Sequence, residues 1–412
     1  MQQVNKISDS KQSAWDLFAI QLSGWISLPI LATSVIILQM NSFIGAILTI
    51  IVGNAISWFI RLGIISMSYE KRQSTLDISA EYTGKIGKYF IAILLIVSTF
   101  SWFIAQTSSG SASITSLLHI KENQEIDQFT QISVFFGIVS TLFCMGGMLL
   151  LRKLSTISFP ILFIGFIIIL YLLPDKTIHT NNQPVSMAGL TLVLATNLGM
   201  TADLPTFFRH SQSWKASIIA LTALQLASLG LGICSLYFGS IISKGFEVNQ
   251  DIIFANESLR MIIIGFIFLS VICANVANVY SASVGWEIIA PKGLIGRKEY
   301  FILGLGLTTV FILVSDIFSP EFLLNISDSS LVNLAIVLLL GYLISQYKKK
   351  PPCSSEQIAY FIAWLLSTIV NIFQFSDFIF YKISPILVSI ITITILTSLF
   401  TLTKHAWMFI RR

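Results

Sequence analysis

The chain has 412 residues, of which 55% are hydrophobic and only 11% are charged, with a formal net charge of +5. A water-soluble protein of this size carries about 25% charged residues, so the composition excludes a soluble fold and predicts a protein that lives in a lipid bilayer. The net charge is small and the basic residues are dispersed, which excludes a nucleic-acid partner.

Apolar runs without Asp, Glu, Lys or Arg follow one another along the chain. A membrane helix needs about 20 mostly apolar residues, and the first run, 17–60, is long enough for two helices with a turn near residues 39–42. The other runs are 89–118, 129–151, 154–174, 180–202, 216–243, 261–286, 301–315, 329–347, 357–376 and 383–403. The sequence therefore predicts an all-α polytopic membrane protein with twelve transmembrane helices.

Lys and Arg are distributed unevenly between the two sides. With the N-terminus in the cytoplasm, the inside segments hold 20 of the 25 Lys and Arg. The positive-inside rule then predicts a multi-pass protein of the cell (inner) membrane with cytoplasmic N- and C-termini. The inside segments are 1–14, 61–88, 152–153, 209–215, 292–298, 348–356 and 404–412. Segment 61–88 is too polar to span and is predicted to lie at the cytoplasmic face, with a short amphipathic helix.

Enzyme, channel and pump signatures are missing from the sequence. It contains no P-loop, no H-E-x-x-H and no paired-Asp phosphate motif, and its four histidines fall in loops or at span ends. No ring of like charges or repeated filter loop indicates a channel, and no soluble segment is long enough for the nucleotide site of a pump. We therefore expect no catalytic residues, no metal and no cofactor, and secondary transport remains.

Two spans carry a similar interruption. Residues 21–29 of span 1 and 197–205 of span 6 each contain an amide, a Leu, a small residue and then Leu-Pro at matching offsets. Transporters built from two inverted halves open each half with a helix broken at mid-membrane. The freed backbone groups then face protein, ions or substrate, so Gln21 and Asn197 are candidate substrate contacts. The alternative for each interruption is an ordinary proline kink.

This repeat predicts how the chain is divided. A five-plus-five inverted repeat is followed by two C-terminal helices. The units are a cytoplasmic N-terminus (1–14), a first half with spans 1–5 (15–173), a second half with spans 6–10 (187–347), spans 11 and 12 (357–404), and a cytoplasmic tail (405–412).

Spans 3 and 8 supply side chains suited to a planar ligand. Trp102 and Gln106 are four residues apart and share one helical face, which offers a flat π surface beside an amide. On span 8, Asn275 and Asn278 are three apart and can point the same way. The alternative for these asparagines is bonding between membrane helices.

Asp203 is the carboxylate placed beside a predicted break, six residues before Arg209. Ionisable groups inside a membrane are functional hypotheses by default, so Asp203 is a candidate for proton coupling. The alternative is an ionic latch or helix cap near the cytoplasmic face.

Stretches 201–209 and 275–285, with the polar loop 75–88, resemble the nucleobase-cation-symport-1 family of cytosine, purine, allantoin and hydantoin permeases. The resemblance extends from Trp15 to about Arg297. It implies the five-plus-five fold with two extra helices, uptake of a planar heterocycle, and coupling to Na⁺ or H⁺.

Site residues also follow from the resemblance. The stacking Trp and its amide match Trp102 and Gln106, and the polar contact on span 8 matches Asn278, with Asn275 as the second choice. The family adds an aromatic in span 6, but residues 194–200 contain none, so Trp25 is a candidate replacement.

Sodium-coupled members place hydroxyls one turn before the span 8 Asn. This chain has Ile272 and Cys273 there, and Ser270 is the nearest hydroxyl. The expected coupling ion is therefore H⁺ or Na⁺, with Asp203 and Ser270 as the candidate coupling residues.

Together these patterns predict a cation-coupled importer of a nucleobase or related heterocycle, such as cytosine, a purine, a hydroxymethylpyrimidine or a hydantoin-like compound. Its expected partners are that small molecule and the lipid bilayer. An amino-acid or amine carrier on the same fold is the first alternative, and it would need a helix N-terminus for a carboxylate or an acidic partner for the amine. An intramembrane enzyme or scaffold is the second.

Overall fold

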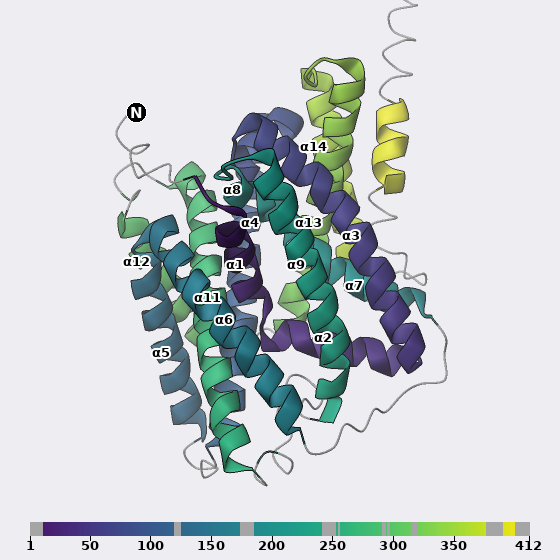
Figure 1. Cartoon of the computed structure of the whole chain (residues 1–412). Coiled ribbons are helices and arrows are strands. Elements are labelled where there is room, and N and C mark those ends of the chain that lie inside the picture. The colour runs from purple at the N-terminus through teal and green to yellow at the C-terminus, as the bar shows by residue number, and fades with distance from the viewer. Residues whose placement is uncertain are drawn as a thin grey trace, which may run out of the picture.

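The computed structural model describes residues 11–118, 125–173, 185–240, 253, 256–290, 294, 297–314, 320–375 and 390–399. Within these residues the named elements are all helices, and the β-structure consists of an isolated bridge between Gln12 and Ser211. Figure 1 shows the helices bundled with their long axes roughly aligned, except for α2, which crosses the bundle. The elements are α1 (Ala14–Trp25), α2 (Leu28–Met40), α3 (Phe43–Lys71), α4 (Thr75–Leu117), α5 (Glu125–Cys144), α6 (Gly147–Leu172), α7 (Met187–Gly199), η3 (Thr201–Asp203), α8 (Leu204–Phe208), α9 (Trp214–Ser235), η4 (Leu236–Ser240), α11 (Glu257–Ile289), α12 (Arg297–Val314), α13 (Pro320–Lys348) and α14 (Ser354–Phe375).

Every predicted span contains helix. In the described residues seven helices are long and apolar enough to cross a membrane, and the bent pair α1–α2 makes an eighth. Shorter apolar helices cover parts of three further predicted spans, the last of them Ile390–Leu399. The all-helical, multi-pass membrane architecture is thus confirmed, and the turn predicted near residues 39–42 lies between α2 and α3.

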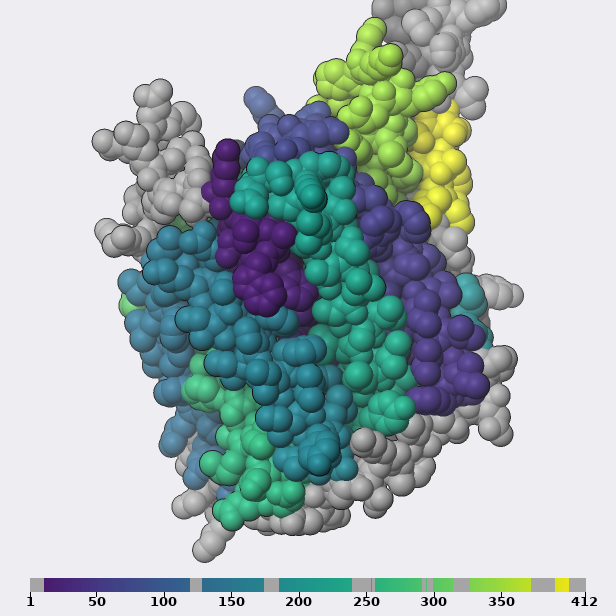
Figure 2. Space-filling view, in the orientation of Figure 1, coloured from purple at the N-terminus to yellow at the C-terminus, as the bar shows by residue number. Residues whose placement is uncertain are grey.

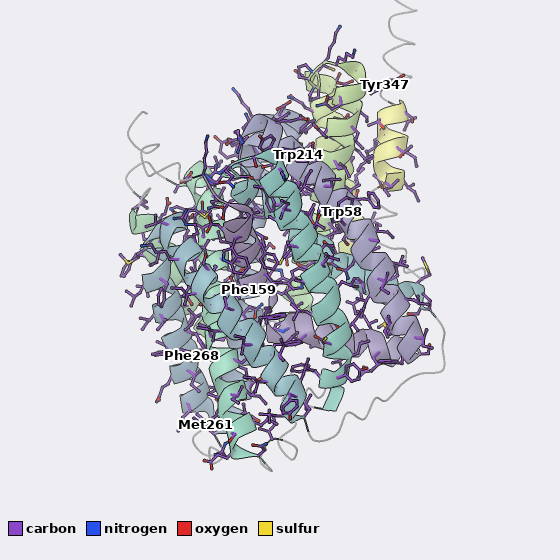
Figure 3. All side chains as sticks on the ribbon, viewed as in Figure 1. Trp58, Phe159, Trp214, Met261, Phe268 and Tyr347 are labelled. Carbon is purple, nitrogen blue, oxygen red and sulfur yellow. The ribbon has the colours of Figure 1, made fainter. Side chains whose placement is uncertain are left out.

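The outer surface of the bundle is apolar. Along α6 the side chains of Ile157, Ile161, Ile164 and Ile168 recur at helical spacing and are exposed. Soluble proteins rarely expose contiguous apolar patches of this kind, so this stripe faces lipid. Figure 3 shows apolar side chains projecting from the outside of the bundle, among them the labelled Met261.

Small polar residues fix where several helices begin. Ser42, Ser74, Ser186 and Ser213 each accept a hydrogen bond from the backbone N–H three residues later, which satisfies a donor that the first turn leaves free. Ser13 does the same for α1 in a capping box with Asp16. These caps fix the N-terminal ends of α1, α3, α4, α7 and α9.

The structure differs from the prediction in the first part of segment 61–88, which we expected to lie outside the spans. Helix α3 continues to Lys71, so residues 61–71 belong to a long helix and Arg61 is buried in the bundle, only 1% exposed. The prediction failed because it ended each span at the first charged residue. A short helical stretch does begin at Thr75, and it is separated from the rest of α4 by Gly84, whose φ of 74° favours glycine.

Helices α4 and α11 pack against each other at the centre of the bundle. Gly285 of α11 approaches α4 so closely that a Cβ there would lie 2.7 Å from the carbonyl oxygen of Ala92. Helix α1 also packs on α6, α9 and α11, and Figure 2 shows it at the surface between α6 and α9. The predicted site helices, spans 1, 3 and 8, are therefore neighbours.

Candidate functional site

Span 1 is broken where we predicted it. Helices α1 and α2 meet at an angle of 66°, with Ile26 and Ser27 outside both helices. Pro29 lies in the first turn of α2, where its missing N–H removes no helical bond. The break therefore leaves backbone groups at the end of α1 and the start of α2 inside the protein.

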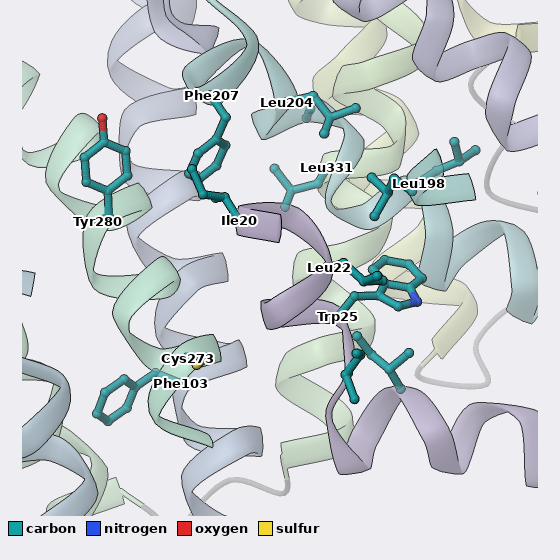
Figure 4. Packing of buried hydrophobic residues seen from close by; sticks show 14 of the residues in the cluster. Ile20, Leu22, Trp25, Phe103, Leu198, Leu204, Phe207, Cys273, Tyr280 and Leu331 are labelled. Atoms are coloured by element: carbon teal, nitrogen blue, oxygen red, sulfur yellow. The ribbon is translucent and has the colours of Figure 1, made fainter. Parts of the chain in front are cut away.

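Span 6 is interrupted by a 3₁₀ turn, although Met187–Phe208 runs on as one apolar span without the sharp bend of span 1. Helix α7 ends at Gly199, the 3₁₀ turn η3 follows, and α8 begins at Leu204 with Pro205 in its first turn. Figure 4 shows the two breaks close together, with Leu22 and Trp25 at the end of α1 and Leu198 at the end of α7. Leu331 of α13 lies beside them in the same cluster of buried residues.

One face of α4 connects the two breaks. Gln106 donates from Nε2 to the hydroxyl of Ser27 at 2.9 Å, and its Oε1 has no hydrogen-bond partner in the described residues. One turn earlier, Trp102 donates from Nε1 to Oδ1 of Asp328 at 2.9 Å. Asp328 lies against Gly199, where a Cβ would come within 2.9 Å of the carboxyl carbon. Trp102 and Gln106 are therefore held between the end of α7 and the start of α2.

Asp328 is a site residue that our sequence reasoning missed. Span 10 was predicted to start at residue 329, whereas α13 begins at Pro320 and carries Asp328 into the bundle. Asp203 is consequently not the sole carboxylate beside a break. The sequence could have indicated it, because Asp328 directly adjoins the apolar run 329–347. An acidic residue at the edge of such a run is a candidate functional residue, as one inside it is.

The two asparagines of α11 have different surroundings. Asn275 is fully buried and donates from Nδ2 to the hydroxyl of Thr107 on α4 at 2.9 Å. Asn278 is partly exposed and makes no hydrogen bond with any described residue. Asn275 thus joins two helices, and Asn278 keeps an amide available to a ligand.

Arg61 is a second site residue that our sequence reasoning missed. Its guanidinium donates to Thr201 Oγ1 at 3.1 Å, to Gln225 Oε1 at 2.9 Å and to the carbonyl oxygen of Asn197. It also lies 5.3 Å from the centroid of the Trp25 ring. The carbonyl end of a helix carries partial negative charge, so Arg61 supplies a fixed positive charge at the end of α7.

Trp25 and Asn197, both candidate substrate contacts, lie beside this arginine. Asn197 bonds within its own helix to Val193 at 3.0 Å and accepts from Ser228 at 3.4 Å. Trp25 is buried beneath Arg61 and also borders a pocket between α2, α3, α7 and α9. The structure therefore gives both side chains protein partners.

The remaining candidates lie elsewhere in the core. Gln21 is 8% exposed and makes no hydrogen bond with a described residue, and the hydroxyl of Ser270 is buried without a partner among them. Asp203 accepts hydrogen bonds from Thr206 at 2.7 Å and from Ser281 of α11. Asp203 therefore links span 6 to span 8 through hydroxyl groups.

Comparison with known proteins gives a fold and no family assignment by sequence. No family model matches the chain, and no curated protein matches it. Among solved structures, the chain is similar to Mhp1, a nucleobase-cation-symport-1 family transporter solved in a closed conformation with bromovinylhydantoin bound, with a TM-score of 0.67 at 14% identity over 96% of this chain and 94% of that one.

Two further structures share the architecture. The manganese transporter of Eremococcus coleocola has a TM-score of 0.58 at 13% identity, covering 96% of this chain and 94% of its own. A Na⁺-coupled sialic acid symporter in a substrate-bound outward-open state has a TM-score of 0.59 at 11% identity, covering 91% and 92%. The fold is thus the one shared by these transporters, in agreement with the fold implied by the sequence resemblance.

Proposed function

We propose that this protein is a secondary transporter that carries a planar heterocycle across the cell (inner) membrane by alternating access. The observation that carries the proposal is the Trp102 and Gln106 face, which lies between two broken spans with an unpartnered amide oxygen. A flat indole beside unpaired hydrogen-bonding groups suits a flat ring bearing nitrogens and carbonyls. The fold shared with Mhp1, whose structure contains a hydantoin, supports the same substrate class.

The transport test is uptake of radiolabelled cytosine, a purine and a hydroxymethylpyrimidine into proteoliposomes, beside a panel of amino acids. Saturable uptake of a heterocycle supports the proposal. Uptake of amino acids alone favours the amino-acid carrier, and no saturable uptake of any compound favours the enzyme or scaffold alternative.

The twelve-span topology with both termini cytoplasmic belongs to this proposal. It follows from the excess of Lys and Arg in the inside segments, an excess that remains with Arg61 moved into the bundle. Reporter fusions after Arg412 and within residues 174–187 should give cytoplasmic and external signals respectively. The reverse pattern would contradict the orientation.

We further propose that transport is coupled to protons or is facilitated. Na⁺ prefers oxygen ligands, as hard cations do, and Ile272 and Cys273 offer none at the positions where sodium-coupled relatives would carry hydroxyls. Asp203, beside the second break and bonded to α11, is the proposed titrating group.

A further inference from the structure

We propose that Asp328 selects a substrate with a positively charged N–H group on the edge of its ring, so that the transported compound is a cationic amino-substituted heterocycle. This inference rests on the proposed function and narrows its substrate class. The amine-carrier alternative required an acidic partner for the amine, and in this inference Asp328 plays that part for a heterocycle.

The carboxylate of Asp328 has bonding capacity to spare. Trp102 occupies Oδ1, and Oδ2 receives no hydrogen bond from a described residue. Asp328 is largely covered by the protein and keeps a small exposed surface. A carboxylate accepts and cannot donate when ionised, whereas an Asn or Gln amide can present either function by turning over. When it is ionised, Asp328 therefore requires a ligand group that donates a hydrogen bond.

No described cation neutralises Asp328. The ion pairs found in the described residues involve Asp77, Glu81, Glu257 and Glu356, all elsewhere in the chain. Arg61, the buried cation of this region, directs its guanidinium to the Thr201, Gln225 and Asn197 oxygens. A buried carboxylate inside a membrane protein is costly unless it takes up a proton or pairs with a cation. A ligand that brings a positive charge therefore stabilises the ionised form of Asp328.

The end of α7 positions Asp328 and does not itself attract a cation. Asp328 lies against Gly199, the last residue of α7, and Arg61 already bonds the Asn197 carbonyl of this helix end. Gly199 also lets the carboxylate approach, because a Cβ would come within 2.9 Å of Oδ1. The attraction for a substrate cation here therefore comes from the carboxylate of Asp328.

The indole of Trp102 specifies where that charge sits on the ligand. Its N–H bond to Asp328 places the carboxylate at the edge of the indole and restricts rotation of the ring. A flat ligand stacked on the indole then brings a substituent on its own edge within reach of Asp328. The indole face also attracts cations, so stacking and the carboxylate favour the same ligand.

A matched pair of probes tests the charge alone. 4-Amino-5-aminomethyl-2-methylpyrimidine carries an ammonium where 4-amino-5-hydroxymethyl-2-methylpyrimidine carries a hydroxyl of nearly the same size. Affinities of both are measured by isothermal titration on the purified full-length protein in lipid nanodiscs. We expect the wild type to bind the aminomethyl compound at least about tenfold more tightly, as pairing of a buried charge predicts.

Asp328→Asn keeps the shape of the side chain and removes its charge. We expect it to lose that preference, so that the ratio of the two affinities falls towards one, and Asp328→Glu to retain part of the preference. Asp77→Asn is the matched control, because it removes a carboxylate that is bonded to Lys88 at 2.9 Å, and it should leave the preference unchanged. A melting curve verifies that Asp328→Asn is folded. If it does not fold, Asp328→Glu is compared with the wild type instead.

The outcomes separate this inference from the proposed function. Equal wild-type affinity for the two probes, or a preference that survives in Asp328→Asn, overturns the role of Asp328. If both probes bind equally and both lose affinity in Trp102→Ala, the heterocycle site stands and only the charge selection falls. If neither probe binds and no heterocycle is taken up, both proposals fall.

Discussion

Replacing Arg61 with methionine removes a buried guanidinium from the end of α7 while keeping much of the side-chain volume. The arginine makes three hydrogen bonds, to Thr201, Gln225 and the Asn197 carbonyl, and it contacts the Trp25 ring. We expect the variant to fold with the break of span 6 less firmly held.

The size of the effect follows from two opposing contributions. Hydrogen bonds to a charged group contribute roughly 1.5–3 kcal/mol each, and burying a charged group in the protein costs several kcal/mol, which the methionine variant recovers. Thr201 keeps its bond to Asn197 at 3.2 Å, but Gln225 Oε1 loses the donor that Arg61 provided. We therefore expect a net destabilisation of about 2–4 kcal/mol.

The assay is thermal unfolding of the detergent-purified protein, followed by tryptophan fluorescence. Arg61→Met should lower the apparent melting temperature by several degrees. Arg61→Lys should fall between it and wild type, because an ammonium keeps the charge but lacks the planar fork of donors. Arg260→Met serves as the control, since Arg260 pairs at 3.5 Å with Glu257, whose side chain is 83% exposed, and such surface pairs contribute about 0–1 kcal/mol.

A methionine variant as stable as wild type would refute the reasoning. It would mean that burying the charge costs as much as its hydrogen bonds supply. The fixed positive charge would then contribute nothing to holding the break together.

Three further predictions concern transport. Trp102→Ala should weaken heterocycle binding more than Trp102→Phe does, because stacking needs an aromatic face and contributes on the order of 1 kcal/mol or more. Equal loss in both variants would argue that Trp102 packs and does not stack. Gln106→Leu and Asn278→Leu should express normally and weaken binding by roughly 1–3 kcal/mol each, the cost of an unpaired polar group, and unchanged affinity in both would place the site elsewhere. In proteoliposomes, accumulation should follow an imposed pH gradient without sodium and be lost in Asp203→Asn, whereas strong stimulation by a sodium gradient at fixed pH would defeat the proposed proton coupling.

Sequence by itself determined the features that depend on neighbours along the chain. Apolar runs predicted helix in every span, and the small residues with Leu-Pro predicted the bend of span 1 and the 3₁₀ interruption of span 6. The spacing of Trp102 and Gln106 predicted that they share a helical face, and the structure places that face between the breaks. Composition and helical period are local properties, so they do not depend on how distant parts of the chain pack.

Only the tertiary structure decided the surroundings of the charged and amide groups. Arg61 looked like the start of a cytoplasmic segment, and Asp328 looked like the end of a loop, yet both lie at the break of span 6. The resemblance ranked Asn278 first and Asn275 second, and in the structure Thr107 binds Asn275 while Asn278 makes no hydrogen bond with a described residue. Hydropathy assigns a charged residue to water, whereas inside a bundle its place depends on partners more than a hundred residues away, and those partners meet only when the helices pack.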